Sequence, residues 1–215
     1  MPYFQNKNVN CLFIHIPKTG GTSVEKYFSS KYNIPLNSKS LYGFIPNEIR
    51  APLMLQANTF QHIIYKVLAK NQHLFRIQSL PNFKIYTIVR NPYERMISDL
   101  FYFKLIETSF KPHDVYVCII KYLFGNKTYD NHRLPQRTFI EDKYGNIPPN
   151  VCILHTETLT EDMKKFGFED FDMNANVNPH RQNIGSYYDF LNHKSIFIIN
   201  QIYQKDFLSF GYKMI

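Results

Sequence analysis

The segment 15–23, which reads H-I-P-K-T-G-G-T-S, has the composition of an anion-binding turn between a strand and a helix. Two adjacent glycines let a backbone wrap closely around a ligand, and the N–H groups that open a helix favour negative charge. A lysine and three hydroxyl groups add donors for charge-assisted bonds to a phosphate-like group. The residues expected to hold that group are Lys18, Thr19, Gly20, Gly21, Thr22 and Ser23.

Two other interpretations of this segment are possible. Nucleotide kinases use the pattern G-x-x-x-x-G-K-[ST], in which the lysine follows the last glycine. Here Lys18 precedes both glycines and the preceding apolar run supplies no first glycine, so the order argues against a kinase-type loop. A packing role for the glycines would suffice for a lone Gly-Gly pair, but it leaves the rest of the segment unexplained.

A second segment with binding chemistry, 88–98, reads I-V-R-N-P-Y-E-R-M-I-S. Arg90 follows an apolar run, and Ser98 lies about two helical turns further along the chain. A guanidinium and a hydroxyl that converge on one group suit a phosphate. Taken alone, Asn91 and Pro92 are equally typical of an ordinary helix start.

Together the two segments resemble the donor site of the sulfotransferases, particularly the Golgi-type carbohydrate enzymes and their small bacterial and viral relatives. The donor in that family is 3′-phosphoadenosine-5′-phosphosulfate (PAPS). The resemblance implies that Lys18 and its loop hold the sulfate and the 5′-phosphate, that Arg90 and Ser98 hold the 3′-phosphate, and that no metal is required. Weaker similarity at 134–139, 153–159 and 206–212 extends it over essentially the whole chain.

Sulfuryl transfer also needs a base for the proton of the acceptor hydroxyl, and the ordinary pKa of histidine suits that task. The Gln61-His62 pair resembles the family segment whose histidine is the catalytic base, which implies that role for His62. Relatives often carry a threonine two residues later, where this chain has Ile64. The alternative bases are His15, His155 and Glu25, the last because some glucosaminyl sulfotransferases use a glutamate.

A polar segment at 178–181 corresponds to the place where relatives put residues over the nucleotide. Its Asn178, His180 and Arg181 are therefore further candidates. Arg181 would add positive charge there, or it is a solvated surface arginine.

The predicted strands and helices alternate, which places both binding segments at strand–helix turns. Apolar runs predict buried strands at 11–16, 84–89 and 151–154. Helical spacing predicts helices at 22–31, 60–71, 93–101, 115–124, 159–166 and 189–207, with Thr22 and Ser23 as caps of the first. This alternation predicts a single α/β domain over 1–215, with a central parallel sheet flanked by helices, a P-loop-like turn and ligands at the carboxyl ends of the strands.

The composition of the chain limits which partners and which cellular compartment can be expected. The chain has 25 Lys plus Arg against 17 Asp plus Glu, a formal net charge of +8, which favours anionic partners. The 3 cysteines are far apart and predict buried thiols in a reducing compartment. No signal-peptide or membrane-spanning stretch is present, so we expect a cytoplasmic, bacterial or virus-encoded protein.

The expected partner is a hydroxyl-bearing acceptor, a carbohydrate, and no nucleic acid. Which hydroxyl is sulfated and the oligomeric state cannot be read from the sequence. Two rival functions remain, a nucleotide or small-molecule kinase and a non-catalytic binder of polyanions on the same fold.

Overall fold

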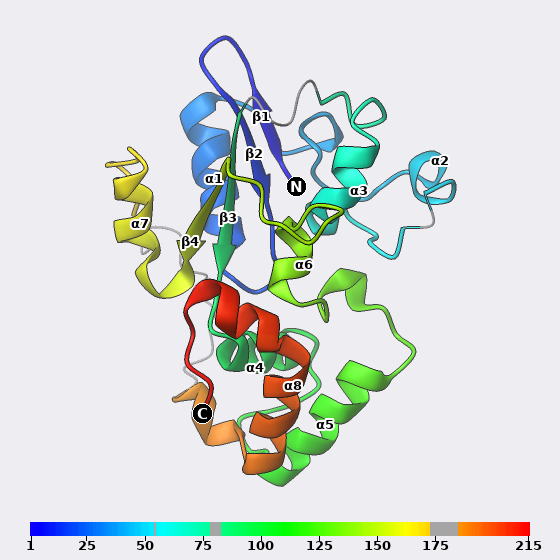
Figure 1. Ribbon diagram of the computed structural model, residues 1–215, viewed down its shortest axis with the longest axis vertical. Helices are drawn as coiled ribbons and strands as arrows, with labels where there is room; N and C mark the ends of the chain where they lie inside the picture. The colour runs from blue at the N-terminus through cyan, green and yellow to red at the C-terminus, as the bar shows by residue number, and fades with distance from the viewer. Residues whose placement is uncertain (54, 78–82, 173–184) are drawn as a thin grey trace.

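The computed structural model describes residues 1–53, 55–77, 83–172 and 185–215. Its strands form one mixed sheet in the order β1-β2-β3-β4 (Figure 1). The strands are β1 (Tyr3–Gln5), β2 (Asn10–Ile14), β3 (Lys84–Val89) and β4 (Val151–His155). The last three run parallel, with Leu12 opposite Ile85 and Thr87 opposite Ile153.

The expectation of an all-parallel sheet is wrong at one edge, because β1 pairs antiparallel to β2. The connection 6–9 is too short for a crossover, so the two strands can only form a hairpin. Asn6 N–H donates to the carbonyl of Val9 at 2.9 Å and closes this turn. Strand β1 is only three residues long and is followed by polar residues. It therefore has no apolar run from which a strand could be predicted.

Helices cover both faces of the sheet, as expected. The helices are α1 (Gly21–Tyr32), α2 (Asn47–Arg50), α3 (Tyr65–Lys70), α4 (Pro92–Tyr102), α5 (Pro112–Phe124), α6 (Gln136–Ile140), α7 (Leu159–Lys165) and α8 (His193–Phe210). On one face, Phe28 of α1 and Met163 of α7 pack with Phe13 of β2. On the other, Leu68 of α3 and Phe139 of α6 belong to one core cluster.

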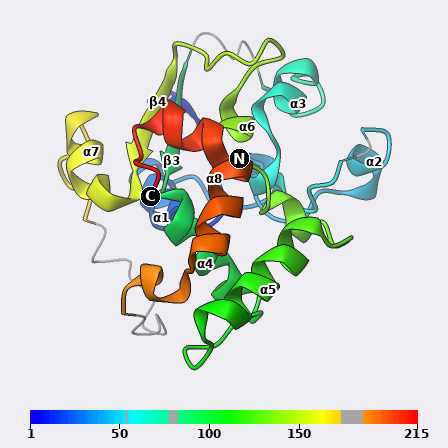
Figure 2. The same cartoon turned by 60° about the horizontal axis from the view of Figure 1, so that its bottom comes forward.

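A third cluster joins α4, α5 and α8. Figure 1 places these helices beyond the ends of the strands to which the arrows point, and Figure 2, in which this end comes forward, shows α8 and α5 around α4. The carboxyl ends of β2, β3 and β4 therefore face this helical layer. The predicted location of the ligand site lies at this junction.

Two predicted helices are interrupted. The segment 60–71 is a 3₁₀ turn, η2 (Phe60–His62), followed by α3, because Ile63 and Ile64 between them have extended backbone. The segment 189–207 is likewise the end of η7 (Tyr187–Phe190) followed by α8.

Thr22 and Ser23 are not caps, contrary to expectation. The cap of α1 is Gly20, whose left-handed backbone (φ 88°) turns the chain into the helix one residue earlier. Thr22 and Ser23 therefore lie in the first turn of α1.

The three cysteines are free thiols. Cys11 is buried as expected, whereas Cys118 and Cys152 are partly exposed. In the described part of the chain, no helix has the length and apolar character needed to cross a bilayer.

Candidate active site

The loop between β2 and α1 holds the first predicted binding segment in a fixed shape. The hydroxyl of Thr19 donates to the carbonyl of Ile16 at 2.9 Å, and the hydroxyl of Thr156 donates to the carbonyl of Thr19 at 2.7 Å. A side chain at Gly21 would lie 3.0 Å from the ring of His15, so only glycine fits without a shift. The N–H of Ser23 donates to the carbonyl of Gly20 at 3.2 Å, whereas the N–H groups of Gly21 and Thr22 precede the first bonds of the helix and can bind an anion.

Lys18 lies in this loop with a left-handed backbone (φ 65°). Its ammonium sits 4.2 Å from the centre of the Tyr102 ring, a cation–π contact. Burial lowers the pKa of Lys18, and the carboxylate of Asp99 partly opposes this effect. No carboxylate among the described residues forms an ion pair with Lys18, so its charge can pair with an anionic ligand.

Arg90 is placed at the end of β3 by Gln136 of α6. The Gln136 amide bonds to both the N–H and the carbonyl of Arg90, each at 2.8 Å. The guanidinium of Arg90 lies over the Tyr187 ring at 4.8 Å and donates to the carbonyl of Lys18 at 3.4 Å. The two predicted cationic residues are therefore neighbours on adjacent turns.

Glu94 is a member of this site that the sequence analysis missed. Its Oε2 accepts from Nη2 of Arg90 at 3.0 Å and from Nε at 3.3 Å. Ser98 lies one helical turn further along α4 and is half-buried, and no described residue is bonded to its hydroxyl. The four-residue spacing of Arg90, Glu94 and Ser98 is the signal that could have revealed this shared face.

His62, the predicted base, ends the 3₁₀ turn η2. Its Nδ1 lies 2.7 Å from Oδ2 of Asp130 and 3.1 Å from the hydroxyl of Thr59. Burial lowers the pKa of His62 from 6.5 to about 4, while the bond to Asp130 partly opposes the shift. The imidazole is therefore neutral at physiological pH, which is the form that can accept a proton.

Three histidine rings lie in a row. The ring centres of His15 and His62 are 5.5 Å apart, and those of His62 and His132 are 4.8 Å apart, both edge to face. His132 stacks on Tyr102, with centres 5.5 Å apart and planes at 9°, and Tyr102 in turn contacts Lys18. This row connects the predicted base to the predicted sulfate-binding lysine. Sequence reasoning did not single out His132 or Tyr102.

Each of these histidines bonds through Nδ1 to its own carboxylate. The pairs are His15 with Glu25 at 2.6 Å, His62 with Asp130 at 2.7 Å and His132 with Asp99 at 2.7 Å. Glu25 is fully buried and faces His15, and its second oxygen has no partner among the described residues. As an alternative base it would have to act through His15.

The remaining predicted site residues lie elsewhere. His155 ends β4, pairs with Asp162 at 3.2 Å and packs against Tyr212. The candidates Asn178, His180 and Arg181 lie outside the described residues.

Helix α4 connects the two halves of the site through buried polar groups. The guanidinium of Arg95 donates to the carbonyl of Pro17 at 3.0 Å and to that of His132 at 2.6 Å. Asp99, on the next turn, accepts from Tyr122 at 2.7 Å in addition to pairing with His132. One helix thus fixes the loop that carries Lys18 and the turn that packs on His62.

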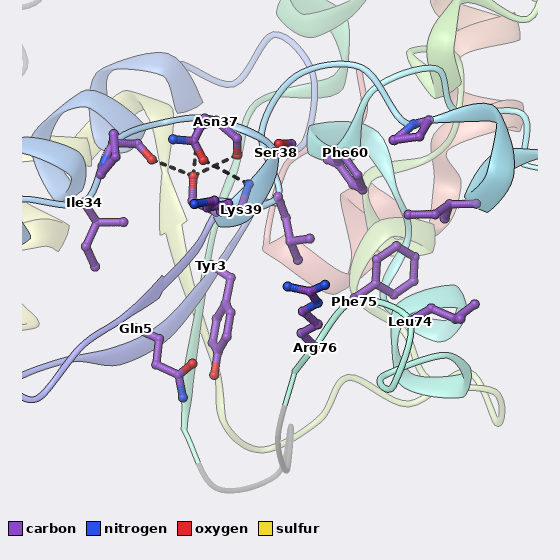
Figure 3. Close-up of a pocket in the computed structure, with 15 residues that line it drawn as sticks. Tyr3, Gln5, Ile34, Asn37, Ser38, Lys39, Phe60, Leu74, Phe75 and Arg76 are labelled. Carbon is purple, nitrogen blue, oxygen red and sulfur yellow. Dashed lines mark hydrogen bonds between the residues drawn. The ribbon is translucent and has the colours of Figure 1, made fainter.

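A cavity of about 610 Å³ lies beside β1, the segment 34–41 and the turn 74–76 (Figure 3). Phe60 lines it, but none of Lys18, Arg90, Ser98 or His62 does. It is therefore distinct from the site described above. Among the described residues, no cluster of three or more histidine, cysteine or acidic side chains is arranged to hold a metal ion.

The arrangement combines two cations beside a helix start with a neutral, partly buried histidine. Such a set can bind a polyanionic donor and accept a proton from a hydroxyl. Comparison with known proteins adds one match: the model of the Sulfotransferase family aligns with residues 1–213. No curated protein and no solved structure gave a significant match.

Proposed function

The chain belongs to the sulfotransferase family, and on that premise we propose that it transfers a sulfuryl group from PAPS to a hydroxyl of a carbohydrate acceptor. The observation that carries the proposal is the contact between the two cationic turns, in which Arg90 donates to the carbonyl of Lys18 at 3.4 Å. This contact brings the proposed sulfate and 3′-phosphate residues into one site. PAPS supplies the activated sulfuryl group.

The donor residues fit a nucleotide with phosphates at both ends. Lys18 has no carboxylate partner among the described residues, and the loop at Gly20 and Gly21 brings backbone N–H groups beside it. Arg90 uses three of its five N–H donors on Glu94 and Lys18 and also bonds to the side chain of Tyr187, so a phosphate would meet a guanidinium that is already oriented. Ser98 offers a hydroxyl on the same face of α4. These residues would hold the donor by charge-assisted bonds.

His62 would accept the proton of the attacking hydroxyl. The ring is neutral at physiological pH, because burial holds its pKa at about 4. Lys18 would stabilise the negative charge that develops on the leaving phosphate. The mechanism thus relies on positioning and on charge stabilisation, as in other group transfers between oxygens.

Titration calorimetry tests the donor site without knowledge of the acceptor. The desulfated product, 3′-phosphoadenosine-5′-phosphate (PAP), should bind at least about tenfold more tightly than adenosine 5′-monophosphate, because a charge-assisted bond contributes about 1.5–3 kcal/mol. Equal binding of the two nucleotides would contradict the proposal and favour a kinase or a polyanion binder. Transfer of labelled sulfate from PAPS to a panel of oligosaccharides then tests the acceptor class.

A further inference from the structure

The carboxylate of Asp130 is saturated by donors from the segment that carries His62. Its Oδ1 accepts the N–H groups of Asn58 and Thr59, the latter at 3.2 Å. Its Oδ2 accepts the hydroxyl of Thr59 at 2.8 Å and lies 2.7 Å from Nδ1 of His62. Burial would raise the pKa of Asp130, but these bonds outweigh it and hold the pKa below its ordinary value. Asp130 is therefore an ionised acceptor.

An ionised carboxylate cannot donate a hydrogen bond, so the proton between the two groups belongs to Nδ1 of His62. The hydroxyl of Thr59 gives its own proton to Asp130 and can only accept from the ring, from which it is 3.1 Å away. A neutral imidazole with its proton on Nδ1 has its lone pair on Nε2. The hydrogen bonds thus select the tautomer that leaves Nε2 free to accept a proton.

The turn that presents Asp130 has an unusual backbone. Tyr129, Asp130 and Asn131 have φ values of 50°, 51° and 66°, in the left-handed region that residues other than glycine rarely adopt in succession. The side chain of Asn131 donates to the carbonyl of His62 at 2.9 Å. The turn therefore bonds to both the ring and the main chain of His62. Strain of this kind persists where the surroundings hold it, often at functional sites.

We propose that Asp130 is a positioning residue for His62, whose tautomer and ring orientation it fixes so that Nε2 takes the proton of the acceptor hydroxyl. The proposal rests on the sulfuryl transfer proposed above. As the acceptor oxygen bonds to sulfur, its proton moves to Nε2 of His62. The bond from sulfur to the 5′-phosphate oxygen breaks, and that oxygen keeps the electron pair. Asp130 then stabilises the imidazolium.

The neighbouring titratable groups do not compete for this role. His15 and His132 contact the ring of His62, but each already bonds to its own carboxylate, Glu25 and Asp99 respectively. Asp130 alone among the described carboxylates forms an ion pair with His62.

The test replaces Asp130 with asparagine. Because two backbone N–H groups need an acceptor, the single oxygen of the asparagine amide would stay with them, and its NH₂ group would face Nδ1 of His62. Asp130→Asn should therefore favour the Nε2–H tautomer, which cannot act as a base. Asp114→Asn is the matched control, since this carboxylate only caps the exposed N–H of Lys111, at 3.3 Å.

Long-range ¹H–¹⁵N correlation spectra of ¹⁵N-histidine protein read the tautomer directly, with the His62 signals assigned by their loss in His62→Gln. We expect an Nδ1–H tautomer in the wild type and the opposite tautomer in Asp130→Asn. Turnover should fall at least about 10²-fold in Asp130→Asn, while the Kd for PAP stays within about twofold. Asp114→Asn should match the wild type in all three measurements.

An Nε2–H tautomer in the wild type would overturn the proposal. Because this measurement uses the wild-type protein, it tests the proposal even if Asp130→Asn fails to fold. An unchanged tautomer in the folded variant, or turnover within about threefold of wild type, would overturn it as well. A wild type that binds no PAP would instead contradict the proposed function, while the spectra still report on the pair of Asp130 and His62.

Discussion

Arg90 and Glu94 form an ion pair in which one carboxylate oxygen accepts from both Nη2 and Nε of the guanidinium, at 3.0 and 3.3 Å. The proposed 3′-phosphate residue therefore has an anionic partner before any ligand binds. A phosphate placed on Arg90 is repelled by Glu94 as well as attracted by the guanidinium. Glu94 would thereby reduce the net positive charge that the proposed nucleotide meets.

Glu94→Gln should strengthen PAP binding about three- to tenfold, because it removes that repulsion from a partly buried site. The gain should be larger for PAP than for adenosine 5′-monophosphate, which has no 3′-phosphate to meet Arg90. Calorimetry of both nucleotides measures the two changes. Glu48→Gln, an exposed position on α2, is the control. Weaker PAP binding in Glu94→Gln would show instead that Glu94 is needed to orient Arg90.

Lys18→Ala should reduce turnover by about 10²- to 10³-fold, and more than it weakens PAP binding, because negative charge on the bridging oxygen grows during transfer. Steady-state kinetics with PAPS and PAP titration separate the two effects. Lys26→Ala removes an exposed lysine of α1 and should leave both unchanged. A normal turnover number in Lys18→Ala would exclude this role.

His62→Ala should lower turnover by about 10²- to 10⁴-fold with the fold and PAP affinity intact, because only the proposed proton acceptor is lost. Glu25→Gln should cost less, since the Glu25 carboxylate is fully buried against His15 and does not face the acceptor directly. Circular dichroism verifies the fold of each variant. Should Glu25→Gln lose activity while His62→Ala retains it, the base assignment would pass to the pair of Glu25 and His15.

The stability of the protein should fall between about pH 6.5 and pH 4. The pKa of His62 is 6.5 unfolded and about 4 in the native state, so in this interval only the unfolded chain binds the proton. The stabilisation is complete above pH 6.5 and is lost as the pH falls through the native pKa, by up to about 3 kcal/mol. Urea unfolding across this range should show a smaller slope for His62→Gln than for the wild type. Equal slopes would show that His62 does not titrate in this way.

The sequence predicted the parts of the fold that depend on local patterns. Strand β3 has the predicted bounds, Lys84–Val89. Both faces of the sheet are covered at this strand, so most of the residues that point to either face are apolar, and they form an almost continuous run in the sequence. The short strand β1 escaped prediction because its pairing with β2, rather than its own composition, makes it a strand.

The predicted site was incomplete for a similar reason. Lys18, Arg90 and His62 each stand in a recognisable local segment. Their partners do not: Asp130 is 68 residues from His62 in the chain, and nothing in its local sequence indicates which group its carboxylate will meet. Only the folded chain places this carboxylate on the histidine.

Arg95 has a consequence for any attempt to move this site to another protein. Its guanidinium holds the carbonyls of both Pro17 and His132, so the loop of Lys18 and the turn beside His62 share one anchor on α4. If only the two loops were grafted, each would lose the hydrogen bond from Arg95 to its carbonyl. The distance between the loops would then no longer be fixed by a shared side chain. The smallest part of the chain that could be transferred with the site therefore includes α4. Surface segments that do not contact Arg95 can be exchanged without affecting this anchor.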